Sequence, residues 1–97
     1  MKRTHAMQIG ELLQDFYDEN PLLKQKMLEI RVQRAWGELL GPMVQHATRS
    51  IYVKNKVLHV ALNSSVLRSE LYLNREQLLK NLNEFAGEMV IESIVIR

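Results

Sequence analysis

A helix-ending signal placed directly before a short alternating segment constrains this chain more than any other feature. The residues at 36–42 read WGELLGP. Gly41 favours the left-handed conformation that closes helices, and Pro42 prevents the helix from continuing. Over residues 49–62 the apolar period changes from that of a helix to two, and Ser64 then supplies a cap for a new helix. The sequence therefore predicts a helix, two short strands and a second helix in direct succession.

Two apolar stripes with helical spacing precede this signal. The first predicts a helix within residues 1–20, capped by Thr4, and consists of Ile9, Leu12, Leu13 and Phe16. The second predicts a helix that ends at Gly41, and consists of Leu28, Val32, Ala35, Trp36 and Leu39. Asn20 is expected to cap this second helix, with Pro21 at its first position. Because Trp36 is in phase with the stripe, we interpret it as a core residue.

The alternating segment has the pattern of a β-hairpin. Ile51 and Val53 alternate with polar residues, and the pattern resumes at Leu58 and continues to Leu62. Asn55-Lys56 is the expected turn, although it lacks the glycine that favours such turns most strongly.

The remainder of the chain predicts helical structure and then a third strand. The helical stripe consists of Leu67, Leu71, Leu78, Leu82 and Phe85, and Gly87 ends it. Asn74 and Gln77 could form a capping box that splits this stretch into two helices, but the stripe fits one continuous helix equally well. The β-branched residues of 90–96 predict a strand that joins the hairpin.

This element order predicts an α+β fold in which a three-stranded sheet carries helices on one face. We expect one domain over residues 1–97, with an N-terminal helix at 1–20 and a core at 21–97. The core order, helix-strand-strand-helix-(helix)-strand, is that of a type II KH domain. A KH domain clamps the nucleic-acid backbone with a Gly-x-x-Gly loop, whereas the matching junction here, residues 73–76, reads LNRE.

The composition excludes several classes of function. The chain lacks cysteine, so disulfides, thiolate metal sites and cysteine nucleophiles are ruled out. Met1-Lys2-Arg3 is followed by polar residues rather than by the apolar segment of a signal peptide, and we expect a soluble, cytoplasmic protein without a membrane span. His5, His46 and His59 are scattered, and neither a glycine-rich phosphate loop nor a nucleophile elbow is present. We therefore expect no enzymatic activity, no cofactor and no small-molecule substrate.

The charge is unevenly distributed along the chain. The net charge is +2, yet residues 21–56 hold seven lysines and arginines against two glutamates, and both ends are mildly acidic. If the apolar hairpin residues face the helices, Tyr52, Lys54 and His59 share the open face, with Arg49 and Lys56 at its ends. Cations beside an aromatic ring suit single-stranded nucleic acid, because the bases stack and the cations meet the phosphates. A polar sheet face that merely keeps the domain soluble is the alternative interpretation.

Arg31 and Arg34 on the preceding helix could extend this basic surface. Ion pairs with Glu29 or Glu38 would explain both arginines as well.

Several segments together resemble the DciA family. They are RAWGELLGP at 34–42, VQHAT at 44–48, VLHVALNSSVLRSEL at 57–71, LLKNLN at 78–83 and IVIR at 94–97. The resemblance implies a KH-like domain of bacterial chromosome replication that interacts with the replicative helicase (DnaB type), promotes its loading and binds DNA. Some members carry a tryptophan where this chain has Val66-Leu67, and longer members add a flexible extension beyond the domain. The resemblance therefore implies a minimal domain.

Three hypotheses follow for the function. The first is a non-enzymatic replication module that binds single-stranded DNA and the helicase. The second is a protein-interaction domain without nucleic-acid binding, in which the open sheet or an edge strand docks a partner. The third, RNA binding, is weakened by the missing Gly-x-x-Gly loop.

Overall fold

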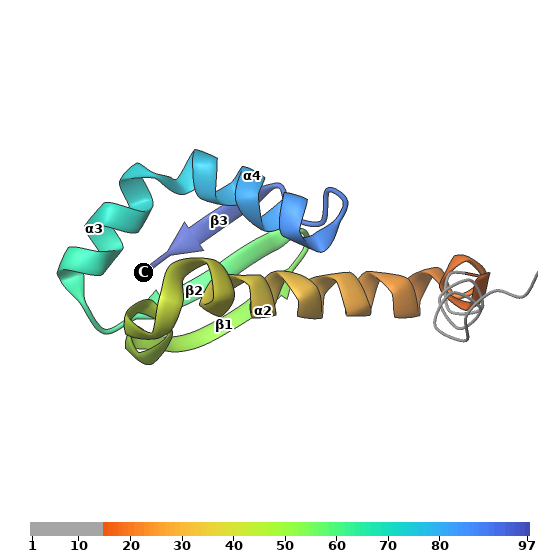
Figure 1. Ribbon diagram of the computed structural model, residues 1–97, viewed down its shortest axis with the longest axis horizontal. Coiled ribbons are helices and arrows are strands. Elements are labelled where there is room, and N and C mark those ends of the chain that lie inside the picture. The colour runs from red at the N-terminus through yellow and green to blue at the C-terminus, as the bar shows by residue number, and fades with distance from the viewer. Residues whose placement is uncertain (1–14) are drawn as a thin grey trace, which may run out of the picture.

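A three-stranded mixed sheet and the helices on one of its faces form the core of the structure. The computed structural model describes residues 15–97. Its elements are α2 (Pro21–Ala47), β1 (Thr48–Lys54), β2 (Val57–Leu62), α3 (Ser65–Leu73), α4 (Arg75–Ala86) and β3 (Ser93–Ile96). The strand order is β1-β2-β3, with β1 and β2 antiparallel and β2 and β3 parallel. The predicted α+β class, the three-stranded sheet and the KH-like order are confirmed (Figure 1).

The core lies between the central strand and the helices. Alternate residues of β2, which are Leu58, Val60 and Leu62, are buried against the helical layer. Trp36 is 2% exposed, as expected of a core residue. Its Nε1 donates a hydrogen bond to Thr48 Oγ1 at 3.0 Å, so the polar atom of the buried ring is satisfied.

The predicted break at Gly41 is present, but its consequence differs from the prediction. Gly41 has φ 89°, a conformation that glycine adopts without steric cost. Pro42 was expected to end the helix, yet helical structure resumes and continues to Ala47. Proline fits the first turn of a helix because its missing N–H is not needed there, so Pro42 restarts the helix after the kink.

One residue of the stripe before Gly41 and one of the stripe that begins at Leu67 are not part of the core. Leu39 is 44% exposed and Phe85 is 45% exposed. Leu39 stands directly before the kink, and its neighbour Leu40 is the residue that packs on the core. Phe85 lies in the last turn of α4, where Leu82 and Ala86 face inward instead.

The third helical stretch forms two helices, α3 and α4, rather than one continuous helix, and the division lies at Asn74. Ser64 caps α3 as predicted, accepting a hydrogen bond from the N–H of Leu67 at 3.3 Å. The capping box of Asn74 and Gln77 does not form, because Asn74 Nδ2 donates back to the carbonyl of Glu70 at 2.9 Å. Of the two alternatives, the split is the one observed, and it forms without the capping box.

At the start of α2, too, an asparagine side chain bonds a preceding carbonyl in place of capping the helix. Pro21 occupies the first turn as predicted, but Asn20 makes no side-chain cap. Its Nδ2 donates instead to the carbonyl of Phe16 at 2.7 Å. Residues 15–19 are helical and Phe16 is 48% exposed. The expectations for Thr4, Ile9, Leu12 and Leu13 lie outside the described residues.

The third strand is shorter than predicted. It begins at Ser93, and the buried residues Val90 and Ile91 form the connection after α4 instead. The Asn83 side chain holds this connection: Oδ1 accepts from the N–H groups of Val90 (2.8 Å) and Ile91 (3.0 Å), and Nδ2 donates to the Ile91 carbonyl (2.9 Å).

Candidate nucleic-acid interface

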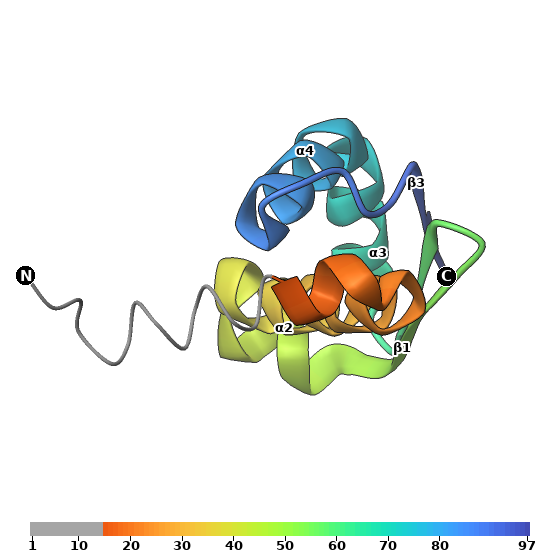
Figure 2. The same cartoon turned by 90° about the vertical axis from the view of Figure 1, so that its right-hand side faces the viewer.

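The hairpin presents one face to the helices and the other to solvent. Its turn, Asn55-Lys56, has φ values of 51° and 63°, the left-handed pair typical of two-residue hairpin turns. The register pairs Tyr52 with His59, so these side chains emerge side by side on the face opposite Leu58 and Val60. Figure 2 shows the helices gathered on the other side of the sheet.

The two rings on the open face are stacked on each other. Their centroids lie 4.8 Å apart and their planes differ by 9°. Tyr52 is 41% exposed, whereas His59 is partly buried beneath its neighbours. The Nδ1 atom of His59 is buried and has no hydrogen-bond partner among the residues described. We call this pair the Tyr52–His59 platform.

The last strand adds two side chains to the platform that the sequence interpretation missed. Val95 pairs with His59 across the parallel ladder and is 38% exposed. Arg97 Nη2 donates to the hydroxyl of Tyr52 at 3.2 Å, which places a guanidinium beside the platform. Alternation along the predicted third strand could have identified them, because residues 95 and 97 are two positions apart and so share one face of a strand.

The expected cations lie at different positions along the hairpin. Lys54 is exposed at the end of β1, on the same face as Tyr52. Arg49 is exposed and lies at a register shift between Thr48 and Ser50, at the opposite end of the strand. Lys56 is exposed in the turn and also lines a cavity of about 240 Å³ with Lys24 and Glu88.

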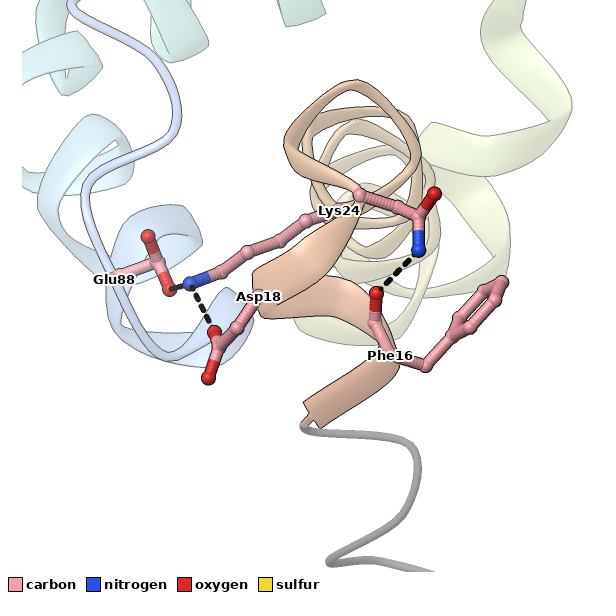
Figure 3. Close-up of polar contacts among 5 residues, drawn as sticks. Phe16, Asp18, Lys24 and Glu88 are labelled. Atoms are coloured by element: carbon pink, nitrogen blue, oxygen red, sulfur yellow. Dashed lines mark hydrogen bonds and ion pairs between the residues drawn. The ribbon is translucent and has the colours of Figure 1, made fainter.

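An ion-pair cluster adjoins this cavity and attaches the first helical residues to the domain. Lys24 Nζ lies 3.9 Å from Asp18 Oδ1 and 3.6 Å from Glu88 Oε2, so one lysine reaches two carboxylates (Figure 3). All three side chains are substantially exposed, so the contacts orient residues 15–19 more than they stabilise the fold. Lys56 lines the same cavity and has no ion pair within residues 15–97.

Arg31 and Arg34 are not brought onto the open face. Arg31 Nη1 donates to the carbonyl of Ala86 at 3.3 Å, where it caps the C-terminus of α4 on the helical side of the sheet. Arg34 is exposed and lines a hollow of about 400 Å³ between α2 and the start of β1. Neither arginine forms an ion pair with Glu29 or Glu38 within the described part of the chain.

The junction where a KH domain carries its backbone clamp has a different construction here. Arg75 lies over the ring of Tyr72 at 4.0 Å from the centroid and donates to the Tyr72 carbonyl at 2.8 Å. Leu73 beside it is 79% exposed. Side chains therefore occupy the place where glycines would let a phosphate approach the backbone.

Residues 15–97 contain no cluster of three or more histidine, cysteine, aspartate or glutamate side chains that could hold a metal ion. No helix within the same range is long and apolar enough to span a membrane.

The comparison with protein families gives an unambiguous result. No curated protein matches the chain. The model of one family, described as Dna[CI] antecedent, DciA, matches residues 8–96 of the 97 residues. The match covers the hairpin, the platform and the helices on which they rest. The chain therefore belongs to the DciA family, a family of replication accessory domains related to helicase loading.

Proposed function

We propose that this protein is a non-enzymatic replication module that binds single-stranded DNA on the open face of its sheet and assists the loading of the replicative helicase. The observation that carries the proposal is the Tyr52–His59 platform, in which the Tyr52 ring is exposed and Arg97 and Lys54 lie on the same face. A base stacked on an aromatic side chain contributes about 1–3 kcal/mol to binding and requires no particular sequence. This role would place the protein in the bacterial cytoplasm.

Each group has a distinct part in the proposed complex. Tyr52, the more exposed ring, stacks a base, while His59 supports it from the adjacent strand. Lys54, Arg49 and Arg97 neutralise phosphates along the sheet, and Lys56 does so at the turn. Arg31 has no part in this proposal, since its guanidinium bonds the Ala86 carbonyl on the helical side of the sheet.

The stacking role is tested with a matched pair of tyrosine variants. Binding of a fluorescent oligothymidylate is followed by anisotropy for Tyr52→Ala and for Tyr72→Ala, whose side chain is 52% exposed on α3. We expect Tyr52→Ala to weaken binding about 5- to 150-fold, which corresponds to the loss of one stacked base. Tyr72→Ala should bind like the wild type. If Tyr72→Ala weakened binding and Tyr52→Ala did not, the DNA would bind at the α3–α4 junction and the open face would be refuted as its site.

The phosphate contacts are tested by the dependence of binding on salt. Each lost contact to a single strand should lower the log–log slope by about 0.7. Lys54→Glu should show this change, whereas Lys80→Glu, the same charge reversal on α4, should not. An unchanged slope for Lys54→Glu in a folded protein would remove the hairpin from the site.

The helicase part of the proposal rests on family membership and requires its own experiment. The protein is mixed with the DnaB-type helicase of the same bacterium, and the mixture is sized at low and at physiological salt. Co-elution at both is expected. Separate elution at both would contradict helicase binding by this chain while leaving the DNA-binding part intact.

A further inference from the structure

The outer edge of β1 is an unpaired strand edge. Among residues 15–97, β1 is the first strand in the order β1-β2-β3 and pairs only with β2. It is seven residues long, against four for β3 at the other edge. In Figure 1 it forms the lower margin of the sheet, with no other described element beyond it. In an antiparallel pair alternate residues direct both backbone groups away from the partner strand, so β1 offers outward N–H and C=O groups to a further strand.

A hollow between α2 and β1 lies next to this edge. It has a volume of about 400 Å³, and Trp36 and Gly37 of α2 and Ile51 of β1 belong to its lining. The Gln45 side chain lies over Gly37, so close that a β-carbon there would meet Gln45 Cδ at 3.0 Å. An added strand would therefore have the β1 backbone on one side and a hollow for a side chain beside it.

The charges around the edge indicate the kind of segment that fits. Arg34 in the hollow and Arg49 and Lys54 along the strand are exposed, against one carboxylate, Glu38. Arg34 and Glu38 are one helical turn apart, yet they form no ion pair in the described structure. The Arg34 guanidinium is thus available to a carboxylate, with which arginine forms strong two-point hydrogen bonds.

The same charges disfavour a second copy of the chain at this edge. Two β1 strands paired antiparallel would bring Arg49 and Lys54 of one copy close to those of the other, and like charges across strands are destabilising. Edge lysines and arginines commonly protect sheets from such self-pairing.

We propose that the outer edge of β1 binds an extended, acidic peptide segment of another protein by strand addition, with a carboxylate of that segment on Arg34. Backbone hydrogen bonds to β1 supply the affinity, and the hollow beside Ile51 takes a side chain of the segment. A nucleic acid lacks the alternating amide donors and acceptors that match a strand edge. The site lies at the edge of the sheet and the Tyr52–His59 platform lies on the open face, and both have Arg49 and Lys54 at their margin.

The probe is a seven-residue peptide with blocked ends in which valine alternates with threonine and glutamate. It is titrated into the ¹⁵N-labelled full chain, and amide shifts and amide hydrogen exchange are recorded. We expect saturable shifts along β1, including Ile51 and Val53, and slower exchange of the outward amides of that strand. A peptide with lysine in place of glutamate should bind at least about tenfold more weakly.

A pair of matched variants locates the charge contact. Arg34→Glu should weaken peptide binding about fivefold, the effect of one exposed ion pair. Lys80→Glu carries the same charge reversal on α4, which packs against β3, and should leave binding unchanged.

Several outcomes would overturn the proposal. They are the absence of saturable shifts in β1, equal binding of the lysine peptide, and equal effects of the two variants. Protection of the β1 amides by an oligothymidylate would assign the edge to DNA, and protection that grows with protein concentration alone would assign it to a second copy. Peptide binding without DNA binding would refute the proposed function and support this inference. DNA binding without peptide binding would refute this inference and support the proposed function.

Discussion

Asn83→Ala should destabilise the fold strongly, because this one side chain makes three hydrogen bonds to the connection between α4 and β3. The asparagine makes three hydrogen bonds of 2.8–3.0 Å to the backbone of Val90 and Ile91. Ile91 is fully buried and Val90 is 9% exposed, so water does not readily replace these bonds. At about 0.5–1.5 kcal/mol for each net bond, the variant should lose about 2–4 kcal/mol. For a domain of this size that loss lowers Tm by roughly 10–25 °C.

Urea unfolding followed by circular dichroism measures this loss, with a thermal scan as a second readout. Asn81→Ala is the matched control, because Asn81 lies on the same helix and its amide oxygen only accepts an exposed bond from Gln77. Asn83→Asp keeps both acceptor bonds but sets an oxygen against the Ile91 carbonyl, so its loss should be intermediate. A loss below about 1 kcal/mol for Asn83→Ala, similar to the control, would show that burial of Val90 and Ile91 holds the connection without the bonds.

Two further predictions concern single contacts of the sheet. Thr48→Val keeps the side-chain volume but leaves the buried Nε1 of Trp36 without its acceptor, so it should cost about 1–3 kcal/mol in urea unfolding; a neutral result would refute the importance of this bond. Lys56→Gly should raise the free energy of unfolding by about 0.5–1 kcal/mol, since glycine adopts the observed φ of 63° without strain. The same variant should lower the salt slope of DNA binding by about 0.7, and an unchanged slope would exclude Lys56 from the interface.

The element order was predictable because the punctuating residues act locally. Ser64 caps α3 with its side chain and Gly87 ends α4 in the left-handed conformation, both as predicted. Gly41 breaks the helix where predicted, although helical structure resumes after it. The hairpin followed from period-two alternation, and its turn formed without glycine because asparagine tolerates positive φ.

The errors occur where a tertiary contact or a competing local bond decides. Leu39 and Phe85 lie in phase with their helices, yet both are exposed. Neighbouring residues pack on the core instead, which are Leu40 beside the kink and Leu82 and Ala86 in α4. Periodicity carries no information on which residues of a helix meet a partner surface. The side chains of Asn20 and Asn74 can each cap the helix that follows or donate to the carbonyl four residues earlier, and in both cases the second bond forms.

The part of the candidate interface on β1 and β2 was predictable from the sequence, whereas the contributions of other elements were not. Alternation placed Tyr52, Lys54 and His59 on the same face, and the register confirms that placement. The approach of Arg97 to Tyr52 depends on the parallel pairing of β2 with β3, which sequence periodicity does not specify. Arg31 appeared available in the sequence because its acceptor, the Ala86 carbonyl, lies 55 residues away.

An amide shift map of the ¹⁵N-labelled protein with an unlabelled oligothymidylate at physiological salt tests whether DNA binds the open face of the sheet. We expect the largest shifts at Tyr52, His59 and Val95, on three adjacent strands of one sheet face, with smaller shifts at Lys54 and Arg97. Shifts centred on Leu73 and Arg75 would place the DNA at the junction used by KH domains and contradict binding at the open face. The absence of any saturable shift would contradict DNA binding by this domain altogether.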